Sequence, residues 1–158
     1  MSLPPFQRFL DAQAADVHRF LVAAVGAVDA DDCFQETFVS ALRAYPRLRE
    51  DSDLRAWVLT IAHRKALDHH RARARRAIPA SDRMPEPVAP AQPSALDRDR
   101  GLWARVHELP RKQRAAVLLR FAGDLSHREV AQALGCSEEA ARRSAHEGLK
   151  KLREELSA

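Results

Sequence analysis

The chain reads LSHREVAQALGCSEEAARRS over residues 125–144. Ser126 and Glu129 have the spacing of a capping box, which predicts that a short helix begins there, and Gly135 suits the position where it ends. Ser137 can begin a longer helix that continues to near the end of the chain. These are the elements of a helix-turn-helix. The stretch predicts either a DNA-reading hairpin or, as an alternative, an ordinary pair of packed helices.

The longer helix divides into two faces at about 100° per residue. Small or apolar side chains share the first face: Ala141, Ala145, Gly148, Leu149 and Leu152. Long polar side chains share the second face: Glu139, Arg142, Arg143, His146 and Lys150. In a major groove, arginines of the first turns can contact guanine edges, while lysines further along lie near phosphates. For Glu139, stabilisation of the helix end and hydrogen bonding to cytosine both stay open.

Two more helices are predicted before the hairpin. One runs through Leu102 and Val106, and the next extends from Pro110 to about Ala122. Proline suits the first position of a helix, because its missing N–H leaves no helical hydrogen bond unmade. Together the four helices predict a small helical domain over residues 98–158.

Residues 77–97 hold five of the nine prolines of the chain and no glycine. Each proline removes a backbone donor and disfavours helix in the residue before it. This segment is interpreted as a Pro-rich linker between two small helical domains. No strand and no repeat is predicted elsewhere, so the predicted fold class is all-α.

Three helices are predicted in the first domain, residues 1–76. Apolar residues recur at helical spacing from Phe6 to Val25, and Gly26 ends this first helix. The inward stripe of the second helix consists of Phe34, Phe38, Ala41, Leu42 and Tyr45. The inward stripe of the third helix consists of Leu54, Trp57, Val58, Ile61 and Ala62. Trp57 is therefore interpreted as a core side chain rather than as a platform for a base.

Positive charge is concentrated in two places. Residues 57–76 carry six Lys or Arg side chains against Asp68 alone, and residues 98–158 carry thirteen against nine acids. Residues 1–56, by contrast, carry six basic and nine acidic side chains. This distribution indicates that the protein binds a polyanion through two separate surfaces. The neighbouring His69-His70 are interpreted as solvated side chains near phosphate rather than as metal ligands.

Composition excludes several classes of protein. The 158 residues are 46% hydrophobic and 30% charged, which suits one ordinary folded domain or two small ones. No apolar run approaches the roughly 18 residues of a membrane span, and no secretory signal is seen. Cys33 and Cys136 form no paired motif, so no disulfide is expected and both thiols are expected to be buried and inert. Without a Gly-rich phosphate loop or a catalytic cluster, an enzyme, a cofactor and a metal site are not expected.

Two pairs of motifs resemble one known family. Residues 31–38 (DDCFQETF) and 54–68 (LRAWVLTIAHRKALD) resemble the promoter-melting domain of bacterial sigma factors. Residues 109–114 (LPRKQR) and 125–135 (LSHREVAQALG) resemble the domain of the same factors that reads the minus-thirty-five element. The two-domain layout is similar to that of the extracytoplasmic-function (ECF) group of the sigma-70 family.

The resemblance implies a transcription initiation factor that binds RNA polymerase core, recognises a two-part promoter and helps to melt it. The residues implied to contact the clamp of the largest polymerase subunit are Asp32, Gln35, Glu36 and Arg43. The residues implied to capture a DNA strand during melting are Arg64, Lys65, His69, Arg71, Arg73, Arg75 and Arg76. Residues 47–52 correspond to the loop that receives a flipped base in the family.

The sequence departs from the family pattern at positions that bear on promoter preference. Arg64 stands where the family often has an asparagine that helps to hold the extruded base. Residues 139–141 read EAA where GTV is usual, and Arg143-Ser144 replaces the usual Ser-Arg. The short helix that precedes the first long one in the family is expected to be missing.

Two other functions stay open from the sequence. One is a stand-alone helix-turn-helix repressor, which needs no polymerase-facing surface. The other is a sigma-like protein that binds core polymerase and cannot open DNA, which Arg64 and the missing short helix suggest. The expected partners are RNA polymerase core, promoter DNA in double-stranded and locally single-stranded form, and an anti-sigma factor. The expected location is the cytoplasm, in association with the nucleoid and without membrane insertion.

Overall fold

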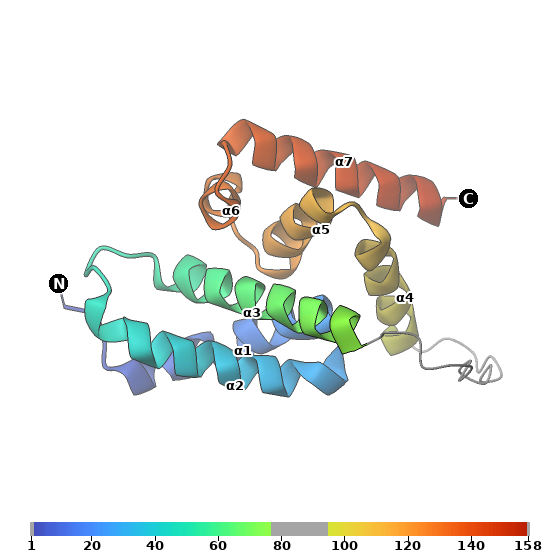
Figure 1. The fold of residues 1–158 in the computed structure, drawn as a ribbon. Coiled ribbons are helices and arrows are strands. Elements are labelled where there is room, and N and C mark those ends of the chain that lie inside the picture. Colours follow the sequence, from blue (N-terminus) through green and yellow to red (C-terminus); the bar gives the residue numbers. More distant parts are fainter. Residues whose placement is uncertain (1, 77–94, 158) are drawn as a thin grey trace.

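The computed structural model describes residues 2–76 and 95–157, and the side chains of residues 2–76 and 101–157. Within these ranges every regular element is a helix (Figure 1). The elements of the first domain are α1 (Phe6–Val25), α2 (Ala27–Ala44), η1 (Tyr45–Arg47) and α3 (Leu54–Arg76). The elements of the second domain are α4 (Ala95–Glu108), α5 (Arg111–Val117), η2 (Leu118–Ala122), α6 (His127–Leu134) and α7 (Glu138–Leu156). The prediction of an all-α protein with two helical domains is confirmed; most of the predicted linker lies outside the described residues.

A single glycine separates α1 from α2. Gly26 has a φ of 89°, a conformation that glycine adopts without steric cost. Its N–H donates to the carbonyl of Val22 at 2.9 Å and ends α1, while its carbonyl accepts from Ala30 at 3.1 Å and begins α2. This sharp turn lays α2 back against α1, and α3 packs on both.

Aromatic side chains fill one end of the first domain. The ring centroid of Phe9 lies 5.3 Å from that of Tyr45 and 5.7 Å from that of Trp57. Phe6 packs edge-on against Tyr45 at 5.3 Å, and the Tyr45 hydroxyl donates to the carbonyl of Pro4. Trp57 is partly buried and packs against the hydrophobic core, in agreement with its interpretation as a packing side chain.

The helix-turn-helix is held by the predicted caps. The Ser126 hydroxyl accepts from the Glu129 N–H at 3.2 Å, and the Glu129 carboxylate accepts from the Ser126 N–H at 2.7 Å. Gly135 ends α6 in the left-handed region at φ 67°. The Ser137 hydroxyl then accepts from the Ala140 N–H at 3.1 Å and begins α7. Each cap satisfies a backbone donor that a helix end leaves free.

The helix predicted from Pro110 to Ala122 changes its winding after Val117. The following turn, η2, is a π-helix that is closed by the Gly123 N–H donating to the carbonyl of Leu118 at 2.9 Å. Asp124 then takes a left-handed conformation with φ 52°. π-helical turns are rare in proteins and are frequently found at functional sites.

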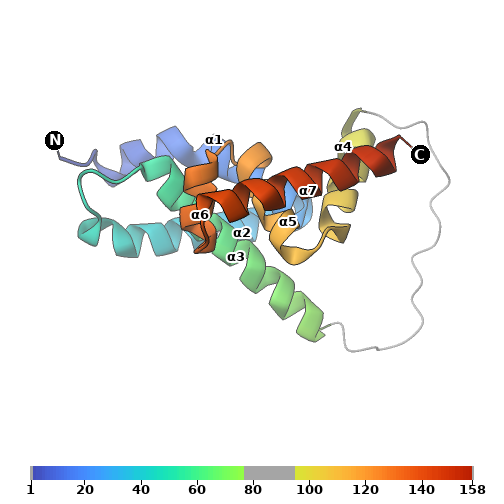
Figure 2. The same cartoon turned by 90° about the horizontal axis from the view of Figure 1, so that it is seen from above.

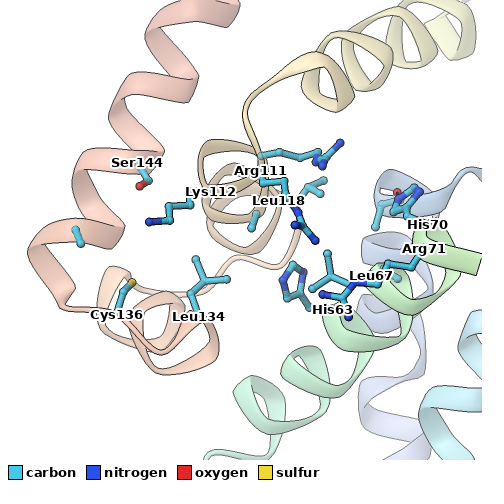
Figure 3. Close-up of a pocket in the computed structure, with 15 residues that line it drawn as sticks. His63, Leu67, His70, Arg71, Arg111, Lys112, Leu118, Leu134, Cys136 and Ser144 are labelled. Atoms are coloured by element: carbon cyan, nitrogen blue, oxygen red, sulfur yellow. The ribbon is translucent and has the colours of Figure 1, made fainter. Parts of the chain in front are cut away.

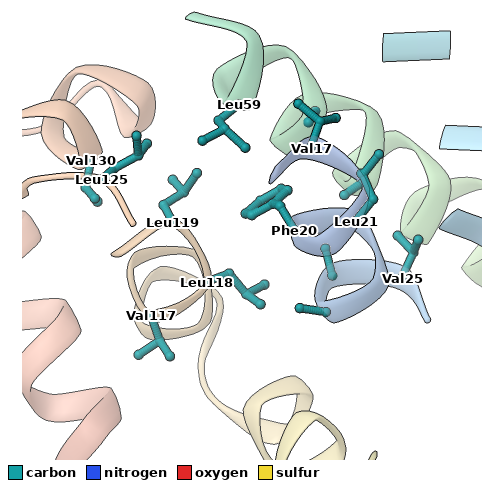
Figure 4. Packing of buried hydrophobic residues seen from close by; sticks show 14 of the residues in the cluster. Val17, Phe20, Leu21, Val25, Leu59, Val117, Leu118, Leu119, Leu125 and Val130 are labelled. Atoms are coloured by element: carbon teal, nitrogen blue, oxygen red, sulfur yellow. The ribbon is translucent and has the colours of Figure 1, made fainter. Parts of the chain in front are cut away.

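The two domains lie side by side in the views of both Figure 1 and Figure 2. They pack directly against each other, and η2 of the second domain contacts α1 of the first. Leu119 is fully buried between Phe20 and Leu59 of the first domain and Leu125 of the second (Figure 4). Leu118, the residue before it, is 5% exposed. The buried side chains of both domains therefore form one continuous hydrophobic cluster.

Two expectations from the sequence are wrong. Leu42, placed on the inward stripe of the second helix, is 54% exposed, because the buried face of α2 runs through Phe38 and Ala41 instead. Cys136, expected to be buried, is exposed. Cys33 is buried, and burial, followed by the charges of Glu36 and other nearby acids, raises the pKa of its thiol to about 11.

His63 makes the stability of the fold depend on pH. It is 5% exposed, and burial together with the charge of Arg64 lowers its pKa from 6.5 to about 4. The unfolded chain therefore binds a proton at a pH where the folded chain does not. Stability is fully present above pH 6.5 and is lost as the pH falls towards 4, by up to roughly 3 kcal/mol.

We expect His63→Gln to remove this part of the pH dependence, because the amide does not titrate. Urea unfolding between about pH 7.5 and about pH 4.5 measures the slope of stability against pH. His146→Gln, at an exposed position on α7, is the matched control and should keep the wild-type slope. Equal slopes for the wild type and His63→Gln would show that His63 does not contribute.

Candidate functional site

The N-terminal half of α7 presents the polar face that the sequence predicts. All five residues proposed to read DNA are exposed: Glu139, Arg142, Arg143, His146 and Lys150. The opposite face is buried through Ala141, Ala145, Gly148 and Leu152. A Cβ at Gly148 would lie only 2.7 Å from Val117 Cγ2, so glycine there allows α7 to approach α5 closely.

The two arginines of this face are paired within their own helix. Arg142 lies 3.2 Å from Glu138, and Arg143 lies 3.3 Å from Glu139, each four residues away. Both arginine side chains remain more than 60% exposed, so the ion pairs are weak and can be exchanged for an external partner. The second turn of α7 thus offers two arginine donors, whose positions are guided by Glu138 and Glu139 in the first turn.

The basic half of α3 carries the residues proposed for strand capture. Arg64, Arg71, Arg73, Arg75 and Arg76 are exposed, and Lys65 is half-buried. The last buried residue of α3 is Ala66, after which the helix continues for nearly three turns. Asp53, whose carboxylate accepts from the Ala56 N–H at 3.1 Å, caps the other end of this helix.

The neighbouring histidines do not behave as the sequence predicts. His69 Nε2 lies 3.3 Å from the Asp29 carboxylate, and Arg73 lies 3.4 Å from the same group. His70 Nε2 donates to the carbonyl of Ala24 at 2.8 Å. Both rings are therefore packed against α1 and α2 rather than solvated, which removes His69 from the freely exposed part of the basic surface.

The outer face of α2 brings together the four residues proposed to contact polymerase. Asp32, Gln35, Glu36 and Arg43 are all exposed. Within the described part of the chain, neither acid nor the arginine forms an ion pair with another side chain. The helix is thus left with unpaired charges along one side.

Three large apolar residues on the same face were missed by the sequence analysis. Val28 is 91% exposed, Val39 48% and Leu42 54%. Val28, Asp32, Gln35, Val39 and Leu42 follow one another at intervals of four, three, four and three residues. This is the spacing of a seam that packs against another helix, and it was available in the sequence as a signal. We call these residues, with Glu36 and Arg43, the α2 stripe.

An open pocket of about 380 Å³ lies between the domains (Figure 3). The first domain contributes His63, Leu67 and Arg71, and the second contributes Lys112 and Ser144, among others. All the charged side chains that line it are basic or histidine. The pocket therefore places the first turns of α7 opposite the middle of α3.

Two further features concern the described residues only. They contain no cluster of three or more side chains able to hold a metal ion. No helix among them is long and apolar enough to span a membrane.

Two family models match the chain and cover most of it. The model of sigma-70 region 2 matches residues 10–76, and the model of sigma-70 region 4 matches residues 100–152. The chain belongs to the sigma-70 family of RNA polymerase sigma factors. These are cytoplasmic initiation factors without enzymatic activity of their own.

A relative in sequence shows to which group of the sigma-70 family the chain belongs. The ECF RNA polymerase sigma factor SigD of Mycobacterium tuberculosis is 35% identical over 153 residues, which cover 90% of this chain and 72% of SigD. The protein is an ECF sigma factor, which directs RNA polymerase to promoters.

Two solved structures share the fold. The sigma factor RpoE of Bartonella quintana, in complex with the anti-sigma factor NepR, has a TM-score of 0.78 at 22% identity over 97% of both chains. CnrH, in complex with the cytosolic domain of CnrY, has a TM-score of 0.74 at 22% identity over 96% of this chain and 87% of CnrH. The likeness extends over both domains of this chain.

Proposed function

We propose that three surfaces of this sigma factor divide the work of initiation. The α2 stripe binds core polymerase at the clamp of the largest subunit. The basic half of α3 captures one strand and melts the minus-ten region. The outer face of α7 reads the minus-thirty-five element. In this proposal residues 1–76 and 98–158 form the two working units, joined by residues 77–97.

The exposure of the α2 stripe is the observation that carries this proposal. A folded monomer gains nothing from placing Val39 and Leu42 in water, and Val28 is almost fully solvated. The charged side chains between these apolar residues can fix the orientation and register of a docking helix, because the partner must place opposite charges against them. A helical partner with an apolar seam and complementary charges fits this surface. A repressor acting alone would have no use for it.

The basic half of α3 suits a nucleic-acid strand for electrostatic reasons. Arg64, Arg71, Arg75 and Arg76 are exposed and gather positive charge on one helix. Such a surface tracks phosphates and gives binding that weakens with salt. Arg64 places a positive charge where the family often has an asparagine amide that holds the extruded base. This supports a preference for a different base sequence in the minus-ten element.

The outer face of α7 suits direct reading of base pairs. Arg142 and Arg143 lie in the first two turns, where a recognition helix reaches base edges in a major groove. Lys150 lies two turns further along, at the level of the phosphates. Glu138 and Glu139 orient the arginines before DNA arrives.

Regulation by a second protein is part of the proposal. RpoE and CnrH, which share this fold, were solved in complexes with NepR and with the cytosolic domain of CnrY. We propose that an anti-sigma factor also binds this chain, and that it holds both of its domains. When released, the protein would associate with the nucleoid together with polymerase.

We expect the double variant Gln35→Ala/Glu36→Ala, and separately Leu42→Ser, to weaken binding to core polymerase by about tenfold or more. Both remove side chains that only a partner can bury. Fluorescence anisotropy with labelled protein and purified core enzyme measures the affinity. Gln7→Ala/Asp11→Ala, on the exposed side of α1, is the matched control and should bind like the wild type. Unchanged binding of the α2 variants would exclude this surface as the interface.

We expect Arg142→Ala and Arg143→Ala each to reduce discrimination at particular base pairs, by about 1–3 kcal/mol for a bidentate contact. Lys150→Ala should instead weaken binding to all sequences alike and lower the salt dependence. Binding of the polymerase holoenzyme to a library of promoter variants, at two salt concentrations, separates the effects. Uniform weakening by an arginine variant would assign that arginine to a phosphate.

A further inference from the structure

The pocket between α3 and the second domain, which we call the interdomain pocket, carries positive charge that no acid balances. Its cationic side chains are Arg71 of α3 and Arg111, Lys112 and Arg114 of α5. Among the described residues, none that lines it is an aspartate or a glutamate. Arg71 approaches Asp68 only to 3.9 Å, in a pair that is more than half exposed and therefore weak. Like charges around a hollow surface with apolar walls raise its electrostatic potential and favour the entry of an anion.

A neighbouring groove shows that this excess of charge is particular to the interdomain pocket. The groove between α2 and α3 also contains arginines, but Asp29, Asp32 and Glu36 line it beside them. Arg73 lies 3.4 Å from the Asp29 carboxylate. The cations of that groove are thus balanced within the protein, whereas those of the interdomain pocket are not.

His63 adds a buried polar group to the wall of the interdomain pocket. Its side chain is only 5% exposed, and in Figure 3 its ring extends from α3 towards the second domain. Burial lowers its pKa to about 4, so the ring is neutral at about pH 7 and has one N–H donor and one acceptor nitrogen. Within the described residues this ring forms no hydrogen bond. Because buried polar groups in proteins nearly always have a partner, the ring is suited to one that enters the pocket.

The remaining wall of the interdomain pocket is apolar. Ala66 and Leu67 of α3 face Leu118 of η2 and Leu134 of α6 across it. Its volume of about 380 Å³ lies in the usual range of small-molecule sites, which are mostly apolar with a few polar groups. An inorganic ion would cover little of this apolar surface. An organic molecule that carries an anionic group would cover the apolar wall and neutralise the cations together.

We infer that the interdomain pocket binds a small phosphorylated molecule with a flat ring, of the size and chemistry of a nucleoside monophosphate. Arg111 and Lys112 bind the phosphate, for which guanidinium and ammonium groups are well suited. Leu118 and Leu134 contact the faces of the ring. His63 hydrogen-bonds to the edge of the ring, where a nucleobase offers both donors and acceptors.

Such a ligand would make initiation respond to a small molecule. Arg71 lines the interdomain pocket and also belongs to the residues proposed to capture a DNA strand. A phosphate bound beside Arg71 would compete with the phosphates of that strand and weaken its capture. This consequence rests on the proposed function, whereas binding of the ligand does not.

The binding site is tested by isothermal titration calorimetry of the full-length protein with AMP and with GMP. We expect at least one of them to bind with a Kd of about 0.1 mM or lower. Adenosine and guanosine lack the phosphate, and inorganic phosphate lacks the ring, so each should bind about tenfold or more weakly. No binding of either nucleotide up to about 5 mM, or equally tight binding of inorganic phosphate, would overturn the inference.

Variants of the pocket locate the bound nucleotide. Arg111→Gln/Lys112→Gln should weaken binding by about tenfold or more, because the phosphate loses two cations. Ala140→Leu narrows the pocket from α7 with a residue that also favours helix, and should abolish binding. Arg8→Gln/Arg153→Gln removes the same charge at exposed positions outside the pocket and should bind like the wild type. Circular dichroism without ligand shows whether each variant is folded, and wild-type affinity in the folded pocket variants would overturn the inference.

The hydrogen bond of His63 has a separate test. His63→Leu removes both ring nitrogens and should weaken nucleotide binding by about fivefold or more. His63→Gln keeps a donor and an acceptor and should bind more tightly than His63→Leu. Equal affinities for the two folded variants would show that His63 does not hydrogen-bond to the ligand.

A short single strand of DNA distinguishes a free nucleotide from a nucleotide within a captured strand. The strand should bind Ala140→Leu as it binds the wild type, and AMP or GMP should compete with it on the wild type only. Loss of strand binding in Ala140→Leu would assign the interdomain pocket to DNA and overturn the inference. Failure of the strand to bind the wild type would count against the proposed function, while calorimetry with the nucleotides would still decide whether the pocket is a binding site.

Discussion

Burial of the second half of α1 is the constraint on which the rest of the structure depends. Phe20, Leu21, Ala23, Ala24 and Val25 are nearly consecutive and all buried, so this part of the helix must be covered on several sides. The helices α2 and α3 cover part of the surface of α1, and η2 of the second domain covers the remainder. Burial of a large apolar side chain contributes about 1.5–3 kcal/mol, so the contact between the domains adds appreciably to the stability of a small protein.

The same constraint leaves other surfaces free. Because α2 and α3 turn one face each towards α1, the α2 stripe and the basic half of α3 remain outside the core. In the second domain, Gly148 brings α7 onto α5 and leaves the arginine face outward. Each working surface is thus the side of a helix opposite to its buried side. This arrangement places recognition on rigid helices and requires no catalytic centre.

Features encoded by neighbouring residues were predicted well from the sequence. The capping box at Ser126, the helix end at Gly135, the start of the last helix after Ser137 and the polar face of α7 follow from local spacing, and the structure contains each of them. Features that depend on distant residues were not. Leu42 was placed inward because apolar residues usually are, and the packing of His69 on Asp29 joins segments that no local pattern connects. The hydrogen bond from Arg55 to the carbonyl of Gly123, just after η2, could not be predicted either, because the two residues are 68 positions apart in the sequence. The functional roles of the site residues remain predictions.

In the proposed function, this chain enables core polymerase to initiate transcription at a particular set of promoters. The most direct measurement is transcription in vitro with purified core enzyme, the protein and a library of genomic fragments, followed by sequencing of the transcript starts. Core enzyme alone is the control. We expect discrete transcript starts that share a two-part upstream element and that appear only when the protein is present. Stable binding to core without such starts would contradict it, and would identify a sigma-like protein that binds polymerase and does not open DNA.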